Sequence, residues 1–328
     1  RRRPVELVEV ETEGDRIRDE LIHRLGKTGA FVRALDERVL DGEADAAVHS
    51  MKDMPTERPP ELVVAGVPGR APAGDVLVTP GPESLGVEDL PSGATVGTSS
   101  LRRGALLRHA RDDISVEPLR GNVDTRVEKL LAPGLQREHE ELLEADDGNE
   151  GSELAAEWFD ERSDLERQAL GREVETEYDA IILAEAGLSR LGLLEELTVA
   201  RLDRSEFVPA PGQGAIAVVA RVGTDATERI HRQVDDPRTR VATTVERTVL
   251  AELGGGCIAP IGVIARLQGE FVHVDAVVCS TDGEEVVSRT RDLPVERHAE
   301  AAADLAGDMA AEGAADLIDR ARAEAEAE

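Results

Sequence analysis

The chain has 328 residues, of which 68 are acidic and 38 basic, giving a net charge of −30, and only three of the basic residues are lysines. A surface this acidic repels nucleic acid and anionic membranes, which argues against both as partners. No run approaches the roughly 20 apolar residues of a membrane span. We expect a cytoplasmic protein, because two cysteines make no disulfide framework and no signal peptide is visible. Lysine depletion indicates a halophilic protein, since concentrated salt screens repulsion among carboxylates; an ordinary acidic protein is the alternative.

Short apolar runs alternate with helical patterns along most of the chain, which predicts an α/β fold. A first domain is expected over residues 1–70 and 205–233. Its predicted strands are 5–10, 46–48, 62–67 and 215–220, with a helix at 31–40. A Pro- and Gly-rich stretch at 68–74 indicates a domain boundary.

Two further domains are expected, over residues 75–204 and 236–328. The second domain has predicted strands at 76–78, 95–97, 114–119 and 180–183, and helices at 101–110 and 123–131. Residues 132–176 are interpreted as an acidic surface insertion with one amphipathic helix, marked by Leu154, Trp158, Leu165 and Ala169. The last domain has a helix from about 236, strands at 261–266, 271–278 and 285–290, a hairpin turn at 282–283 and a closing helix that Gly313 interrupts.

Cys257 follows three consecutive glycines between a predicted helix and a predicted strand. Glycines let another molecule approach the backbone closely, so this thiol is a candidate for covalent chemistry. The alternative is a small apolar side chain that fills a turn. The other cysteine, Cys279, lies in an apolar run and is expected to be buried.

Polar segments follow predicted strands at 49–55, 97–103 and 119–126. Ligands bind at the carboxyl ends of strands in open α/β sheets, and helix N-termini attract anions. Arg102 and Arg103 oppose the dipole of the helix they begin, so they are better explained as ligands for carboxylates. Internal pairing with Asp or Glu is the alternative for these arginines, and Asp53 could instead be a capping residue.

Six motifs stand in one order: HSMKDMP at 49–55, VGTSSLRR at 96–103, LRGNVDTR at 119–126, YDAIILA at 178–184 with GLSRLGL at 187–193, PGQGA at 211–215 and GGC at 255–257. In these motifs the chain resembles the porphobilinogen deaminase (hydroxymethylbilane synthase) family, in a haloarchaeal-type form, from about residue 5 to the end apart from the insertion. The resemblance implies two doubly wound lobes of the periplasmic-binding-protein type and a smaller α/β C-terminal domain. It also implies a transferase of porphyrin biosynthesis, leading to haem and cobalamin, that joins four porphobilinogen molecules with loss of ammonia into the linear tetrapyrrole hydroxymethylbilane.

The resemblance assigns a role to each motif. Cys257 would carry a dipyrromethane cofactor through a thioether, and Asp53 would be the catalytic carboxylate, which stabilises developing positive charge and assists proton transfer. The groups expected to hold the acetate and propionate arms of the cofactor are Lys52, Thr98, Ser99, Ser100, Arg102, Arg103, Arg120, Gly121, Arg126 and Arg190. Those expected at the substrate are Arg24, Lys27, Ser50 and Gln213, and no metal is expected.

The sequence departs from the family pattern at its beginning. Arg1 stands at what corresponds to the family's second strand, so the first strand and helix of the first domain are missing here; either the sequence is truncated or the protein lacks this element. Glu13 stands where family members commonly have an arginine. A monomer is the expected assembly, although the sequence leaves oligomeric state open.

Other functions remain open from the sequence alone. One is a two-lobed binding protein that captures a carboxylated ligand without turnover, and another is an inactive, truncated deaminase. A binding protein has no need of a thiol presented by glycines, so Cys257 favours the enzyme. A cysteine hydrolase would need a basic partner such as His49, which already belongs to one of the six motifs.

Overall fold

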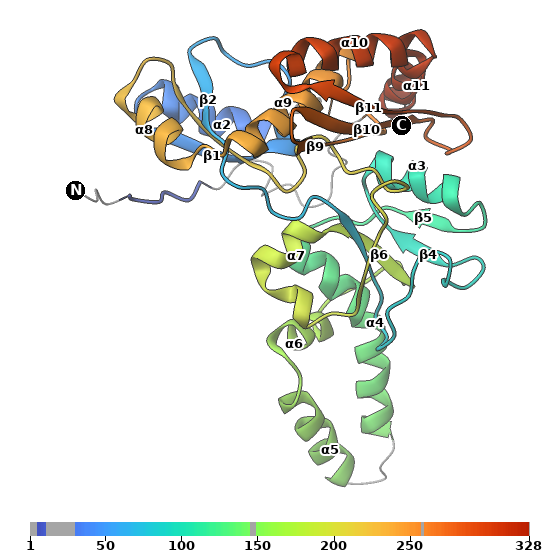
Figure 1. Ribbon diagram of the computed structural model, residues 1–328. Helices are drawn as coiled ribbons and strands as arrows, with labels where there is room; N and C mark the ends of the chain where they lie inside the picture. The colour runs from blue at the N-terminus through green and yellow to red at the C-terminus, as the bar shows by residue number, and fades with distance from the viewer. Residues whose placement is uncertain (1–4, 11–29, 145–148, 257–258, 328) are drawn as a thin grey trace.

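The computed structural model describes residues 5–10, 30–144, 149–256 and 259–327 (Figure 1). Three β-sheets lie within these ranges, each with helices packed against it and with buried apolar residues at its centre. This arrangement confirms the expected three-part α/β architecture. None of the helices in these ranges has the length and apolar composition that a membrane crossing requires.

The first sheet has the strand order β1–β8–β2, and both outer strands are antiparallel to the central one. Its elements are β1 (Ala46–Ser50), β2 (Leu62–Gly66), β8 (Ile216–Arg221), α2 (Ala30–Leu40) and α8 (Asp225–Val234). The late strand β8 therefore returns to the first part of the chain, as predicted. Helix α8, which packs on β2 and β8, was not predicted from the sequence.

The predicted strand at residues 5–10 is wrong. These residues form no strand, and Val5 and Leu7 are 85% and 88% exposed. An extended segment becomes a strand only when its backbone groups find partners, and none of the described strands pairs with it.

The second sheet has the order β5–β4–β6–β3–β7, in which β4 is parallel to β5 and β6. Helices α3, α4 and α7 follow these three strands, so all three helices begin at the same edge of the sheet. The element bounds are β3 (Asp75–Val78), β4 (Thr95–Gly97), α3 (Leu101–Ala110), β5 (Ser115–Glu117), α4 (Val123–Glu144), β6 (Ala180–Ala184), α7 (Glu185–Leu191), η2 (Leu193–Glu195) and β7 (Val199–Arg201).

The acidic insertion forms an arm that projects from the second sheet, at the bottom of Figure 1. Helix α4 continues to Glu144, and α5 (Asn149–Asp160) and α6 (Asp164–Leu170) pack along it. The predicted single amphipathic helix is therefore wrong, because its marker residues belong to two helices. Ser163 and Glu166 form a capping box, which begins α6 after α5 has ended at Asp160.

The third sheet is the antiparallel meander β11–β10–β9. Its elements are α9 (Pro237–Glu252), β9 (Ile261–Gln268), β10 (Phe271–Cys279), β11 (Val286–Pro294), η3 (Val295–Arg297), α10 (His298–Ala311) and α11 (Ala314–Ala327). Gly313 has a φ of +102° and separates the last two helices, as predicted. Cys279 is buried, also as predicted, and burial raises the pKa of its thiol to about 12, which makes it unreactive.

Candidate functional site

Two segments of the chain, residues 66–75 and 201–215, cross between the first and second sheets and are bonded to each other. Leu202 N donates to Asp75 O at 3.0 Å, and Ala71 N donates to Gly214 O at 3.2 Å. Gly212, at the turn of the PGQGA motif, has a φ of +77°, and a Cβ there would lie 2.6 Å from Met51 Cγ. The glycine therefore lets this crossing lie against the HSMKDMP segment.

Helix α9 of the third part is anchored to the same crossing by Glu246, whose side chain is completely buried. Arg70 donates to its two oxygens from Nη1 and Nη2 at 2.6 and 2.9 Å. The backbone N–H groups of Gly212 and Ala265 also donate to it, at 2.7 and 2.8 Å. Four donors from three segments thus compensate the cost of burying this carboxylate.

A second buried carboxylate, Asp75, lies at the start of β3. Arg102 Nη2 donates to Oδ2 at 2.7 Å, and Arg103 donates to Oδ1 from Nε and Nη2 at 3.0 and 2.7 Å. Gln213 Nε2 also donates to Oδ1, at 2.9 Å. Burial alone would raise the pKa of Asp75, but Arg102, Arg103 and Gln213 together outweigh it and hold that pKa well below its ordinary value.

For Arg102 and Arg103 the structure thus favours internal pairing, the alternative that the sequence left open. Their exposed fractions are only 4% and 5%. Besides Asp75, Arg102 donates to Val208 O at 2.8 Å and Arg103 to Ile182 O at 3.1 Å. The predicted substrate residue Gln213 is likewise 1% exposed, with its amide bonded to Ala73 O, Gly74 O and Asp75. These side chains are buried between the first two sheets and do not project into solvent. We call Asp75, Arg102, Arg103 and Gln213 the buried cluster.

Asp53 lies at the end of η1 (Met51–Asp53), a single 3-10 turn that follows β1. Its side chain is exposed, and that of Lys52 is half-buried. Burial lowers the pKa of Lys52, while the neighbouring Asp53 opposes this and Arg103 adds to it. Burial also lowers the pKa of Arg126 to about 10, helped by Arg103 and opposed by Asp53. Lys52, Asp53, Arg103 and Arg126 therefore share one electrostatic environment, which we call the Asp53 site.

The Asp53 site draws on both lobes of the molecule. Lys52 and Asp53 come from η1, which follows strand β1 of the first sheet, whereas Arg103 and Arg126 come from the first turns of α3 and α4 beside the second sheet. Parallel neighbours β4 and β5 bring these two helix starts together, and Ser99 Oγ joins them by donating to Leu119 O at 2.8 Å. The structure thus unites the strand-to-helix junctions that the sequence singled out.

The remaining predicted residues shape these junctions. The Thr98 hydroxyl accepts from Ser100 N at 3.2 Å, and Ser100 caps α3 by accepting from Arg103 N at 3.4 Å. Arg126 Nε donates to Gly121 O at 2.8 Å, and Gly121 has a φ of +115°. Arg120 and Ser50 are half-buried. Arg190 is exposed and donates to Gly214 O at 3.0 Å.

Three predicted site residues, Cys257, Arg24 and Lys27, lie outside the described residues, as does Glu13. Of the loop around Cys257, the described neighbours are Gly256, which is exposed, and Ala259, whose N–H donates to Gly256 O at 3.1 Å.

Asp75, Glu246 and Arg247 were not predicted from the sequence as site residues. Arg247 on α9 donates to the backbone carbonyls of Met51, Met54 and Pro55, around Asp53. The available signal for Glu246 and Arg247 was an adjacent charged pair within residues 241–250 of α9, a stretch that otherwise contains only Val, Leu, Ala and Thr.

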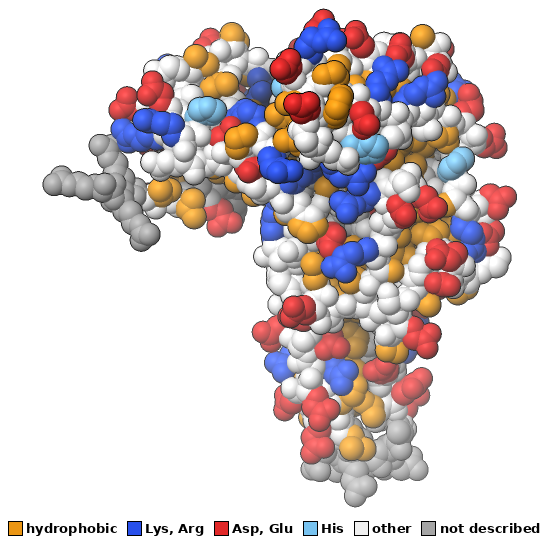
Figure 2. Space-filling view, in the orientation of Figure 1, with side chains coloured by type: hydrophobic (Ala, Val, Ile, Leu, Met, Phe, Trp, Pro, Cys, Tyr) orange, Lys and Arg blue, Asp and Glu red, His pale blue; other side chains and the backbone are white. Residues whose placement is uncertain are grey.

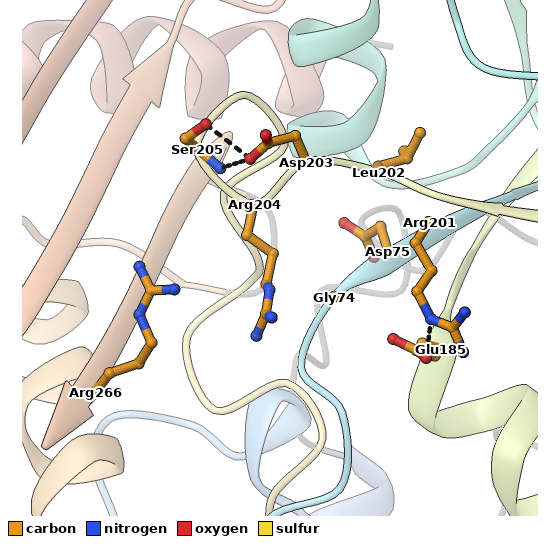
Figure 3. Close-up of a pocket in the computed structure, with 9 residues that line it drawn as sticks. All are labelled: Gly74, Asp75, Glu185, Arg201, Leu202, Asp203, Arg204, Ser205 and Arg266. Atoms are coloured by element: carbon orange, nitrogen blue, oxygen red, sulfur yellow. Dashed lines mark hydrogen bonds and ion pairs between the residues drawn. The ribbon is translucent and has the colours of Figure 1, made fainter.

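A pocket of about 340 Å³ is lined by Asp75, by other residues of the two crossing segments, by Glu185 and by Arg266 of β9 (Figure 3). Arg266 at its border donates from Nη2 to Asp275 Oδ2 at 2.7 Å, and Arg201 Nε donates to Glu185 Oε1 at 2.7 Å. Lys52, Asp53 and Arg126 do not line it. This pocket is therefore separate from the Asp53 site.

Comparison with known proteins places these observations in a family. The family model for the porphobilinogen deaminase dipyromethane cofactor binding domain matches residues 1–139 and 165–229, and the model for the porphobilinogen deaminase C-terminal domain matches residues 241–312. The chain belongs to the porphobilinogen deaminase family. The part that the first model leaves out, residues 140–164, lies within the predicted insertion and contains α5.

Curated relatives agree with this assignment. A probable porphobilinogen deaminase of Halobacterium salinarum is 48% identical over 99% of this chain and 93% of its own length. A probable porphobilinogen deaminase of Methanocella arvoryzae is 39% identical over 96% of this chain and 88% of its own. A porphobilinogen deaminase of Roseiflexus castenholzii is 38% identical over 84% of this chain and 75% of its own.

We predict that Asp75→Asn lowers the free energy of unfolding at pH 7 by about 3–5 kcal/mol, because it leaves two buried guanidinium groups without their carboxylate. The folded-state pKa of Asp75 is depressed, so its stabilising contribution is complete above the unfolded pKa of about 4 and is lost as the pH falls further. We would measure the free energy of unfolding of parent and variant in urea at pH 7 and at pH 2.5. The variant should be less stable than the parent by a smaller amount at pH 2.5 than at pH 7.

Asp225→Asn is the matched control, since Asp225 makes an exposed ion pair with Arg229 on α8. It should change the free energy of unfolding by less than about 1 kcal/mol. A loss for Asp75→Asn as small as that of the control would contradict the structural role of Asp75.

Proposed function

We propose that the protein is a hydroxymethylbilane synthase, a transferase that joins four porphobilinogen molecules with loss of ammonia into a linear tetrapyrrole for porphyrin biosynthesis. Beyond membership of the family, the observation that carries the proposal is the Asp53 site, where one exposed carboxylate from the first lobe stands among cationic groups from the second. This pairing suits a substrate that carries carboxylates and develops positive charge during reaction.

The residues of the Asp53 site fit the dipyrromethane group that the family model names. The acetate and propionate arms of such a group need cationic and N–H donors, and Lys52, Arg126 and the starts of α3 and α4 offer them. When bound through Cys257, the group supplies the primer to which pyrrole units are joined.

Asp53 is the candidate catalytic residue. Loss of ammonia from porphobilinogen leaves an electron-poor carbon, and the pyrrole nitrogen becomes more positive as the new bond forms. A fixed carboxylate stabilises that charge where it develops and can accept the proton that is released. Asp53 is exposed, so a bound pyrrole can approach its side chain.

Arg126 binds carboxylates in this proposal, with Lys52, Arg120 and Arg190 as further cationic contacts. The pKa of Arg126, about 10, keeps its guanidinium charged at neutral pH even though it is largely desolvated. Arg102 and Arg103 do not contact the ligand in this proposal but contribute positive charge from the buried cluster. Both pair with the single carboxylate of Asp75, so the cluster retains a net positive charge.

We also propose that the enzyme works as a cytoplasmic monomer in concentrated salt. The domains would span residues 1–70 with 205–233, 75–204, and 236–328. Support for the salt requirement comes from the net charge of −30 and from three lysines among 38 basic residues; Figure 2 shows acidic side chains over much of the visible surface, with Lys and Arg gathered where its upper and lower parts meet.

The intact mass of the purified protein tests the covalent cofactor. We expect a dipyrromethane adduct after expression in a haem-producing host, and its loss in Cys257→Ala. Cys279→Ala is the matched control and should keep the adduct, because the Cys279 thiol is buried and its pKa is about 12. A bare polypeptide in the parent protein would instead favour a binding protein that captures a carboxylated ligand.

Asp53→Asn tests the catalytic carboxylate. We expect kcat to fall by about 10²–10⁴-fold, the range for loss of an electrostatic or acid–base group, with the unfolding midpoint unchanged. Asp45→Asn, an exposed position just before β1, should retain the parent rate. Near-normal turnover by Asp53→Asn would refute the assignment.

The salt requirement is tested by thermal unfolding between 0.2 M and 3 M KCl. The Debye length shrinks to about 3 Å at 1 M salt, so repulsion among the carboxylates weakens and Tm should rise steeply over this range. A Tm that is highest in dilute buffer would show that the acidic surface is no adaptation to salt.

A further inference from the structure

The turn that carries Asp53 has little to hold it in place by itself. η1 is three residues long, a single turn that ends where Met54 N donates back to Met51 O at 3.3 Å. Ser50 precedes the turn but makes no capping hydrogen bond with its side chain. Short 3-10 turns have poor hydrogen-bond geometry, so the position of Asp53 depends on contacts with the rest of the protein.

Arg247 supplies such contacts from a segment almost 200 residues away. Its Nη1 donates to Met51 O and Met54 O, both at 3.2 Å, and its Nη2 donates to Pro55 O at 2.6 Å. The three carbonyls bracket Asp53 on both sides in sequence. The planar guanidinium makes charge-assisted bonds in fixed directions, so it constrains where the carbonyls lie.

The base of this clamp is rigid, because the preceding residue is Glu246. The buried Glu246 carboxylate binds Arg70, Gly212 N and Ala265 N, which fixes the helical turn that presents Arg247. Met51 and Met54 are each 2% exposed, and Met51 N donates to Ala215 O at 3.0 Å. The turn is therefore held by two buried apolar side chains, by one backbone bond to the PGQGA segment and by the Arg247 guanidinium.

We propose that Arg247 is a positioning residue, which holds the η1 turn so that the Asp53 carboxylate keeps one fixed orientation relative to the helix leading to Cys257. Arg247 stands ten positions before Cys257, on the helix that runs into its loop. The clamp ties the catalytic carboxylate of the first lobe to the part of the chain that would carry the primer. Its catalytic consequence rests on the proposed function; its structural consequence does not.

The test compares Arg247→Met, which keeps the aliphatic stem and removes the donors, with Arg240→Met. Arg240 lies two turns earlier on α9 and also bonds the first lobe, through Asp235 and Val64 O, but it does not touch η1. Arg247→Lys is the conservative variant. It keeps the positive charge, but its ammonium cannot bond all three carbonyls as the forked guanidinium does. The readouts are amide hydrogen exchange of the peptide covering residues 50–55, the intact mass with its adduct, and kcat and KM for porphobilinogen.

We expect Arg247→Met to speed exchange of this peptide at least about tenfold and to retain the adduct. It should lower kcat by about 10–100-fold, the scale of a small misplacement of a catalytic group, with KM changed less than about threefold. Arg247→Lys should fall between parent and Arg247→Met in exchange and in kcat, and it also serves if Arg247→Met does not fold. Arg240→Met should leave the exchange of residues 50–55 and kcat at parent values.

Unchanged exchange of residues 50–55 in Arg247→Met, or equal acceleration in Arg240→Met, would overturn the clamp. Faster exchange with an unchanged kcat would overturn its role in positioning Asp53. A parent protein that binds porphobilinogen without turnover would refute the proposed function instead, and the exchange comparison would still decide whether Arg247 holds η1.

Discussion

The buried Glu246 carboxylate accepts hydrogen bonds from both crossing segments and from β9, through Arg70, Gly212 N and Ala265 N. Uncompensated burial of a carboxylate costs several kcal/mol, so all these donors must be in place together for the fold to be stable. This requirement fixes how the three parts of the molecule meet. The Asp53 site lies next to that meeting point and depends on it, since η1 packs against Gly212 and bonds to the residue after Glu246.

Negative and positive side chains occupy different places in this protein. The surface carries a large excess of carboxylates, whereas the junction between the first two sheets gathers Lys52, Arg102, Arg103 and Arg126. Two of these arginines are neutralised in part by Asp75, which allows them to be buried, while Arg126 keeps its charge near Asp53. An acidic protein can thus offer a dicarboxylate substrate a local positive environment that its overall charge would deny.

Much of this arrangement could be predicted from local sequence signals. A buried strand followed by hydroxyl and arginine residues marks a strand-to-helix junction, and the parallel pairing of β4 with β5 then brings two such junctions together. The same signals could not show that Arg103 is paired internally whereas Arg126 is not. The partner of Arg103 is Asp75, which is distant in sequence and stands at the start of a strand without any motif around it. The segment 5–10 has the composition of a strand, but strand formation needs a pairing partner, which composition does not report. The charged pair Glu246-Arg247 marks a position worth attention, but it does not report what Arg247 bonds to, since its acceptors are backbone carbonyls almost 200 positions away.

Helix α9 belongs to the third part of the chain, but it makes several of the contacts that hold the Asp53 site in place. It begins at a well-formed cap, with the Asp236 side chain accepting from Thr239 N and Pro237 in the first turn. It then attaches to the first lobe through Arg240, to both crossings through Glu246 and to η1 through Arg247, before ending five residues short of Cys257. Because successive attachments lie on one rigid helix, a displacement of the first lobe relative to the loop of Cys257 would have to break several of them together. In this way α9 links η1, which carries Asp53, to the start of that loop. Arg126 belongs to the other lobe and makes no hydrogen bond to α9 or η1 among the described residues.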